Sequence, residues 1–374
     1  MIAIPSRKKI KLAEPVVGDE ELQMIRKVFE SGWVAEGPMA KEFEVKVAEF
    51  TGARHAIATT NCTTALELAL RAINIKPGDE VIVPDFTYPA TADVVSWIGA
   101  EPVLVDVDFT YNIDAEEIEK AISKKTKCIM PVSWGGNPLD YGPLNELKEK
   151  YGLYIIEDAA CSLGSEFAGK KTGTMADITC FSFHARKVIT TGEGGMITTD
   201  DEALAEEIRC LKRFGIQKGE DGEEFVKIGT NYKLSDILAG IGIGQMQRIN
   251  GIIDKHIELA DNYNRLIENV AFVKPPTKNR LAKHVYQTYA VYIEIEGIRD
   301  KIIEELKKEN VETQIGTYAV HLQKAFKNAK IIGDLSVAEK LYRNLLALPM
   351  CYSMTSDDQE YVVQEIARLI KRYS

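Results

Sequence analysis

Lys187 stands in the segment of this sequence that is richest in possible chemistry. It follows the apolar run 178–183, which is typical of a strand, and it lies close to Ser182, His184 and a glycine-rich turn at 192–195. An isolated loop lysine is usually a solvated surface residue. A hydroxyl, an imidazole and several glycines around this lysine indicate a ligand site instead, because glycines permit close approach of a ligand to the backbone.

Asp158 stands at the end of a second predicted strand, the run 154–156. An acid at such a position is ordinarily a helix cap or a loop residue. However, a strand-end acid and a strand-end lysine on neighbouring strands can face one bound cofactor. Asp158 and Lys187 are therefore our candidate catalytic pair.

A run of small hydroxyl residues at 59–65, which includes Cys62 and Thr63, precedes a segment with helical periodicity. The free N–H groups and the dipole at a helix start bind anions. The same residue types are also ordinary N-caps, and the segment alone favours that second interpretation. Both interpretations stay open at this point.

The elements that must position these residues alternate along the chain from about residue 54 to 200. Short apolar runs typical of buried strands occur at 81–83, 103–105, 128–130, 154–156, 178–183 and 196–199. Segments with helical spacing occur at 64–73, 90–98, 114–122 and 144–151, and Asp114 is a suitable N-cap for the third of them. This alternation predicts an α/β fold with a mostly parallel central sheet flanked by helices, and ligands at the carboxyl ends of its strands.

The pattern changes after residue 200. We expect helices at 202–212, 234–249, 254–268, 299–308 and 357–372, a boundary loop at 271–283 and a strand at 288–295. These elements predict two domains: a large α/β domain with its N-terminal arm over residues 1–250, and a smaller α+β domain over 251–374.

The composition of the chain disfavours several classes of protein. The 374 residues are 45% hydrophobic and carry a net charge of −10, which disfavours nucleic acid as a partner. We find no apolar run long enough to span a membrane, and six cysteines without a C-x-x-C pair are too sparse for a disulfide scaffold or a zinc site. We therefore expect a cytoplasmic protein with no metal and no membrane association.

The chemistry-bearing segments together resemble the DegT/DnrJ/EryC1/StrS family, which are pyridoxal-phosphate (PLP) sugar aminotransferases of fold type I. The resemblance runs over nearly the whole chain and includes a highly specific Phe-Ser-Phe-His-x-x-Lys string followed by Gly-Glu-Gly-Gly. The segments that carry it are 31–38, 83–88, 157–160, 181–187, 192–195 and 229–236.

The resemblance implies a role for each matching residue. Lys187 resembles the lysine that binds PLP covalently and shuttles a proton, and Asp158 resembles the partner of the pyridinium nitrogen. Cys62, Thr63 and Ser182 resemble the phosphate-binding residues. Tyr88 matches the aromatic residue that stacks on the cofactor ring, and Asn231 matches a residue that the neighbouring subunit contributes to the phosphate site, which implies a homodimer with shared active sites.

The remaining matches are less specific. Cys161 stands where many members have Gln or His against the cofactor, and because a thiol bonds weakly its role stays open. His184 suits a structural role, a sugar contact or a phosphate neighbour. Trp33 and His321 lie in segments that resemble substrate-binding ones, and for His321 a core or surface histidine is an equal alternative.

The implied reaction moves an amino group from L-glutamate to a keto group of a nucleotide-linked deoxy sugar, an NDP-4-keto- or 3-keto-6-deoxyhexose, in amino-sugar or polysaccharide biosynthesis. Related sugar dehydratases carry His at the lysine position, so Lys187 argues against that activity. Two alternatives remain: an aminotransferase for aminocyclitols or antibiotic precursors, and a non-catalytic regulator that binds sugar nucleotides. Retention of Lys187 and Asp158 disfavours the regulator.

Overall fold

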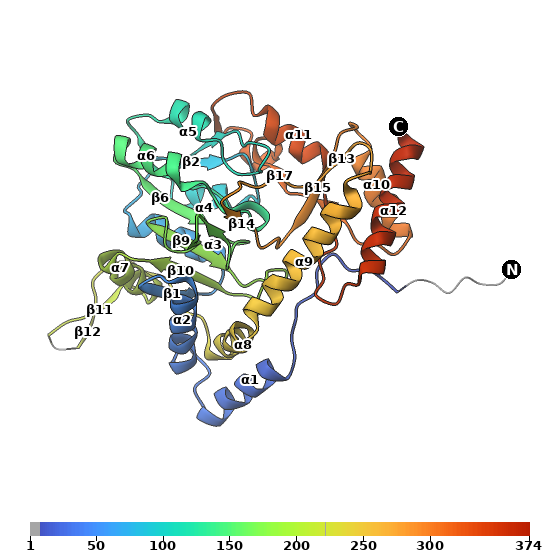
Figure 1. Ribbon diagram of the computed structural model, residues 1–374. Helices are drawn as coiled ribbons and strands as arrows, with labels where there is room; N and C mark the ends of the chain where they lie inside the picture. The colour runs from blue at the N-terminus through green and yellow to red at the C-terminus, as the bar shows by residue number, and fades with distance from the viewer. Residues whose placement is uncertain (1–7, 221) are drawn as a thin grey trace.

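A central 8-stranded sheet forms the body of the molecule in the computed structural model, which describes residues 8–220 and 222–374 (Figure 1). Its strands run in the order β1-β10-β9-β6-β5-β2-β4-β18. Their bounds are β1 His55–Thr59, β10 Gly195–Thr199, β9 Ile178–Ser182, β6 Tyr154–Asp158, β5 Thr126–Ile129, β2 Glu80–Pro84, β4 Glu101–Val105 and β18 Lys330–Ile331. All neighbours from β9 to β18 pair in parallel, while β1 and β10 pair antiparallel. The predicted α/β fold with a mostly parallel sheet is confirmed.

Helices cover both faces of this sheet. On one face, α3 (Cys62–Ala72), α4 (Ala90–Trp97) and α7 (Glu202–Lys212) pack aliphatic side chains against strand residues such as Val81, Leu104 and Ile156. On the other face, α5 (Ala115–Ala121) and α6 (Tyr141–Tyr151) pack against strand residues such as Ile82 and Ile155. Alternate strand residues point to opposite faces, so a strand buried on both faces must be apolar throughout, as the sequence indicated.

The C-terminal part builds a second, smaller layer. A 4-stranded antiparallel sheet has the order β13-β15-β19-β16. Its strands are β13 Val273–Lys274, β15 Tyr289–Ile293, β19 Leu345–Leu348 and β16 Gln314–Ile315, and its helices are α9 Ile249–Ile267, α10 Arg299–Lys308, α11 Ser336–Asn344 and α12 Ser356–Tyr373. Figure 1 shows α9 leading from the body of the molecule to α10 and α12. Strand β18 lies beyond residue 250 and still completes the large sheet. The division of the chain into two domains at residue 250 therefore stays our proposal.

The remaining elements connect these layers or lie at their margins. At the N-terminal end, α1 (Asp19–Ser31) and α2 (Pro38–Thr51) precede the sheet, and α8 (Asp236–Met246) packs with them. Short paired strands are β3 Phe86–Thr87 with β17 Tyr318–Ala319, β7 Glu166–Phe167 with β8 Lys170–Lys171 and β14 Ala282–Lys283, and β11 Ile216–Lys218 with β12 Glu223–Phe225. In Figure 1 the β11–β12 hairpin projects away from the body.

Several predicted boundaries were wrong, and N-caps explain the shifts of α3, α6 and α8. Helix α3 begins at Cys62 rather than residue 64, because the Asn61 side chain accepts the Thr64 N–H at 2.9 Å. Helix α6 begins before residue 144, where Asp140 caps it. The predicted helix 234–249 starts later, because Ser235 caps α8, and α9 starts five residues before the expected 254. The predicted loop 271–283 contains β13 and β14.

Candidate active site

Asp158 lies buried at the carboxyl end of β6, next to Cys180 of β9. Its Oδ2 accepts a hydrogen bond from Thr91 Oγ1 at 2.8 Å, and its Oδ1 accepts the N–H of Ala160 at 3.2 Å. Burial raises the pKa of Asp158, whereas these two donors and the nearby Lys187 lower it. The carboxylate is therefore held in a fixed orientation at the sheet edge where parallel α/β proteins bind ligands. Thr91 was not predicted from the sequence, although Thr87 and Thr91 are spaced four residues apart and their hydroxyls lie 3.1 Å from each other.

Lys187 reaches the same region from the connection after β9. Its backbone N–H donates to the carbonyl of His184 at 2.9 Å, which forms a tight turn. Its Nζ lies 3.2 Å from Cys161 Sγ, three residues beyond Asp158. The structure thus brings together three of the predicted residues: Lys187, Asp158 and Cys161. An amine and a buried carboxylate at one sheet edge are the pair that PLP requires, one for covalent attachment and one for the ring nitrogen.

The start of α3 lies beside Ser182 because three strands are in register. Thr59 of β1 pairs with Gly195 of β10, and Gly195 pairs with Ser182 of β9. A Cβ on Gly195 would meet the Asn61 backbone at 2.4 Å, so this glycine allows the α3 start to approach β10. The turn glycines were predicted to permit close approach of a ligand. Gly195 instead makes room for the backbone of Asn61.

The backbone N–H groups of Cys62 and Thr63 are ready to bind an anion. The Asn61 side chain satisfies Thr64, the third residue of α3, and the Asn61 carbonyl accepts the N–H of Ala65. The first two N–H groups have no acceptor within 8–220 and 222–374. Unpaired N–H groups at a helix start attract phosphate, so the predicted phosphate contacts fit this backbone.

The side chain of Cys62 points into the protein rather than outward. Its Sγ lies 3.6 Å from the Cys180 carbonyl and 4.0 Å from Asp158 Oδ1, and burial raises the thiol pKa well above its usual range. Any phosphate contact of Cys62 is therefore restricted to its backbone N–H. Its thiol instead packs beneath Asp158.

Tyr88 and His321 lie on a second wall at the same sheet edge. Tyr88 follows β3, is 67% exposed and has its ring centroid 6.2 Å from that of Tyr318 in β17. His321 follows β17, and its Nδ1 lies 2.6 Å from Oδ2 of Asp85. An exposed ring beside the buried pair is a suitable surface for stacking a planar cofactor.

The side chains of three predicted residues make no hydrogen bond with Lys187 or Asp158 in the part of the chain described, although the His184 carbonyl accepts the backbone N–H of Lys187. The His184 Nδ1 accepts the N–H of Arg186 at 3.3 Å, which supports a structural role in the Lys187 turn. The indole N–H of Trp33 donates to the carbonyl of Glu36. Asn231 is exposed, and because Ser235 caps α8, the alternative that Asn231 caps this helix is wrong.

Glu157 carries a buried network on the opposite face of β6 from Asp158. It is fully buried and accepts hydrogen bonds from the hydroxyls of Ser133, Tyr141 and Thr179. Burial raises the pKa of Glu157 to about 7, and the three hydroxyls oppose this rise. The sequence analysis did not single out this residue.

We expect Glu157→Gln to reduce the pH dependence of stability. The pKa of Glu157 is about 7 in the folded protein and about 4.3 in the unfolded chain, so this group stabilises the fold below about pH 4.3 and loses that contribution as pH rises through 7. Wild type should lose about 4 kcal/mol of unfolding free energy relative to Glu157→Gln over this window. Urea unfolding of both proteins at several pH values measures the difference. Parallel stability curves would contradict the assignment.

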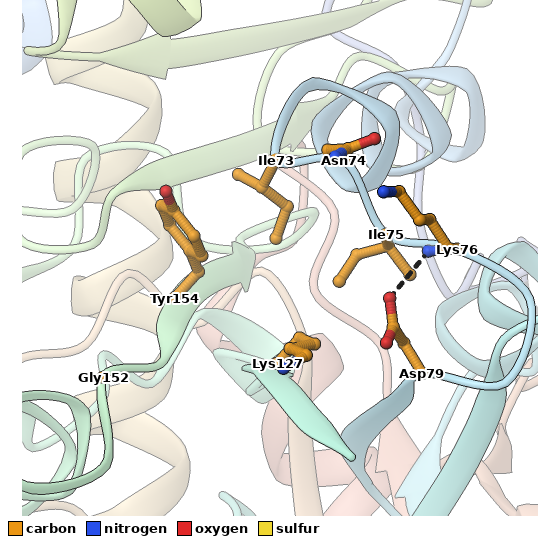
Figure 2. Close-up of a pocket in the computed structure, with 8 residues that line it drawn as sticks. All are labelled: Ile73, Asn74, Ile75, Lys76, Asp79, Lys127, Gly152 and Tyr154. Carbon is orange, nitrogen blue, oxygen red and sulfur yellow. Dashed lines mark hydrogen bonds between the residues drawn. The ribbon is translucent and has the colours of Figure 1, made fainter. Parts of the chain in front are cut away.

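A cavity of about 300 Å³ lies at the opposite, amino edge of the sheet (Figure 2). It is bordered by the starts of β2, β5 and β6, and its lining includes Lys76, Lys127 and Tyr154. None of the predicted site residues lines it. Among the described residues, 8–220 and 222–374, no group of three or more His, Cys, Asp or Glu side chains is arranged to hold a metal ion.

Comparison with known proteins gives the family. The fold is that of PLP-dependent sugar aminotransferases of known structure. A model of the DegT/DnrJ/EryC1/StrS aminotransferase family matches residues 15–367. This chain belongs to that family, which confirms the predicted family, fold and enzyme class.

The individual relatives agree with this placement. GDP-perosamine synthase of Caulobacter vibrioides is 35% identical over 368 residues, which cover 97% of this chain and 98% of that protein. The spore coat polysaccharide biosynthesis protein SpsC of Bacillus subtilis is 34% identical over 375 residues, 96% of each chain. Spr1654 of Streptococcus pneumoniae, solved in PLP and PMP forms, is 27% identical; its PLP form has a TM-score of 0.92 and covers 98% of this chain and 100% of its own. PLP as the predicted cofactor is confirmed.

The structure also bears on membrane association. Within 8–220 and 222–374, every helix is too short or too polar to cross a lipid bilayer.

Proposed function

We propose that this aminotransferase moves the amino group of L-glutamate to a keto group of a nucleotide-linked 6-deoxyhexose, at C3 or C4, for amino-sugar or polysaccharide biosynthesis. The observation that carries the proposal is the meeting of Lys187 Nζ, Cys161 Sγ and buried Asp158 at the carboxyl edge of the sheet. Relatives named for GDP-perosamine synthesis and spore coat polysaccharide biosynthesis support the class of acceptor.

The residues of this chain divide the chemical work. Bound PLP supplies the electron sink for the reaction. Lys187 would hold the cofactor through its Nζ and supply an amine that can accept and return the substrate proton. Asp158 keeps a negative charge at the ring nitrogen, and the N–H groups of Cys62 and Thr63, with Ser182, hold the phosphate. Tyr88 would stack on the ring, Trp33 and His321 would contact the substrate, and His184 would shape the turn that carries Lys187.

A substrate screen tests the function. UDP-, GDP- and dTDP-linked 4-keto- and 3-keto-6-deoxyhexoses are each incubated with the PLP-loaded enzyme and L-glutamate, and products are identified by mass. We expect one nucleotide series to give an amino sugar and 2-oxoglutarate in equal amounts. Amination of a cyclitol ketone or an antibiotic precursor, with no sugar product, would favour the alternative acceptor. No amination of any ketone would favour a binding protein.

We further propose that the enzyme works as a homodimer with shared sites. A surface on and around the β11–β12 hairpin carries large exposed apolar side chains, and we call it the hairpin surface. Its members are Trp33, Val34, Phe214, Phe225, Val226 and Ile228, of which Ile228 is 89% exposed. The Trp33 loop is tied to the Asn231 segment by the hydrogen bond from Asp236 N–H to the Ala35 carbonyl. Large exposed apolar side chains are typical of interfaces between chains when they gather on one surface.

The shared site makes a subunit-mixing prediction. Asn231→Ala should weaken PLP binding about 10-fold or more, because a hydrogen bond to a charged phosphate is lost. Mixing inactive Lys187→Ala with Asn231→Ala subunits should restore activity, since one site of each hybrid carries both defects and the other carries neither. Random exchange should give about a quarter of the wild-type activity.

Subunit exchange is verified by native mass spectrometry before the assay. Asn279→Ala, a change in another exposed loop, is the matched control and should give no PLP defect. Verified hybrids without recovered activity, or an active monomer in sedimentation, would contradict the shared site.

We also propose that the protein acts in the cytoplasm. All six cysteines are free thiols, as expected in a reducing compartment.

A further inference from the structure

Asp85 holds His321 at two points. Asp85 is completely buried directly after β2, and its Oδ1 accepts the backbone N–H of His321 at 2.8 Å. Its Oδ2 lies 2.6 Å from Nδ1 of the same residue, whose side chain stays 16% exposed. The Nε2 of the ring has no hydrogen-bond partner within residues 8–220 and 222–374. The pair therefore leaves one nitrogen of His321 available.

These two contacts decide where the ring proton lies. Because the backbone N–H of His321 can only donate, Asp85 Oδ1 must accept. As a carboxylate, Asp85 also accepts at Oδ2, so Nδ1 carries a proton. The hydrogen bond made by one ring nitrogen fixes the state of the other. Nε2 is thus the atom of His321 that can meet a ligand.

The pair lies on the strand ladder that also carries Tyr88. Thr87 pairs with Tyr318 and Phe86 with Ala319, and the ladder continues with Val320 N–H donating to the Asp85 carbonyl at 2.8 Å. Asp85 and Tyr88 are three residues apart, about 10 Å along an extended chain. A sugar nucleotide whose keto carbon lies at the cofactor near Tyr88 would extend along this ladder toward His321.

We propose that Asp85 is a positioning residue for the acceptor half of the reaction: it keeps the proton on Nδ1 of His321 and thereby presents Nε2 to the sugar nucleotide. The inference rests on the proposed function. It adds a residue that touches neither cofactor nor substrate and acts only through His321. Glutamate reacts before the acceptor binds, so the first half of the reaction does not need this pair.

Asp85→Asn tests the proposal with little change in shape. The amide oxygen must face the backbone N–H of His321, so the amide NH₂ faces Nδ1 and forces the ring proton to Nε2. The same exchange in the triad of serine proteases preserves geometry but leaves the wrong tautomer, which is a documented example from that enzyme class. Long-range ¹H–¹⁵N spectra of ¹⁵N-histidine protein, with His321→Gln to assign the signals, read the tautomer directly.

The two half-reactions are then measured separately by the visible absorbance of the cofactor. We expect Asp85→Asn to convert with L-glutamate within about twofold of wild type. Its kcat/KM for the sugar nucleotide found in the screen should fall about 10- to 100-fold, since that is the size of one lost substrate hydrogen bond. The double variant with His321→Gln should be no worse than His321→Gln alone.

Other outcomes would overturn the inference. Equal slowing of both half-reactions would mean that the Asp85–His321 pair merely joins two parts of the fold. An unchanged acceptor half-reaction or an unchanged His321 tautomer would mean that Asp85 does not position His321 for the substrate. If Asp85→Asn does not fold, His321→Gln carries the test, with the same selective loss expected. If the wild-type enzyme aminates no sugar nucleotide, the proposed function is wrong independently of Asp85. Calorimetric binding of UDP, GDP and dTDP to wild type and to Asp85→Asn then decides whether the Asp85–His321 pair acts on a nucleotide ligand.

Discussion

Lys187→Ala should reduce transamination by more than about 10³-fold while PLP still binds through its phosphate. Alanine can neither attach the cofactor nor move the proton, and general acid–base catalysis alone supplies about 10²- to 10⁴-fold. Among the described residues, Lys187 Nζ has one hydrogen bond, to Cys161 Sγ, so its removal breaks no other hydrogen bond of the fold. Steady-state production of 2-oxoglutarate, with PLP binding followed by calorimetry, measures the two effects separately.

The control is Lys170→Ala, an exposed lysine in β8, which should retain wild-type activity. Lys187→Arg keeps the positive charge and should be as inactive as Lys187→Ala, because a guanidinium remains protonated and cannot form the covalent link. A small primary amine added to Lys187→Ala should restore part of the proton transfer. Substantial turnover of either variant without added amine would remove Lys187 from the mechanism.

Asp158→Asn should lower kcat about 10²-fold or more and change PLP affinity far less. The charge at the ring nitrogen keeps that nitrogen protonated, and its loss weakens stabilisation of the carbanion-like transition state by a few kcal/mol. The neutral amide is nearly isosteric with the carboxylate: its oxygen can still accept the N–H of Ala160, and its NH₂ can donate to the Thr91 hydroxyl, which donates to Asp158 in the wild type. The measurements are kcat from initial rates and the PLP dissociation constant from calorimetry.

Two further variants make this test specific. Asp200→Asn alters an exposed acid just after β10 and should have no effect on kcat. Thr91→Val removes one donor to Asp158 and should cost about 10-fold, the usual size of a hydrogen bond to a charged group. An Asp158→Asn enzyme within a factor of two of wild type would refute the role of the carboxylate.

The amino-acid sequence by itself determined the local structure and the family. Asp114 was predicted as an N-cap, and its side chain accepts the N–H of Glu116 at the start of α5. The predicted helices 202–212 and 299–308 agree with α7 and α10. Such features depend on residues within about four positions of each other, through caps and apolar periodicity, so they can be recognised without coordinates. Lys187 and Asp158 were recognisable because Asp158 ends one strand and Lys187 lies in the short connection after another.

Only the tertiary structure decided which side chains meet. Thr91 reaches Asp158 from another element, and Asp85 holds His321 across 236 positions of chain. The inward direction of the Cys62 thiol likewise depends on how α3 lies against β9. These contacts follow from the order and register of the strands, which are set by burial of whole sheet faces and not by residues close in sequence. The periodicity of the sequence could therefore place each residue on a helix or strand but could not identify the residue that it contacts.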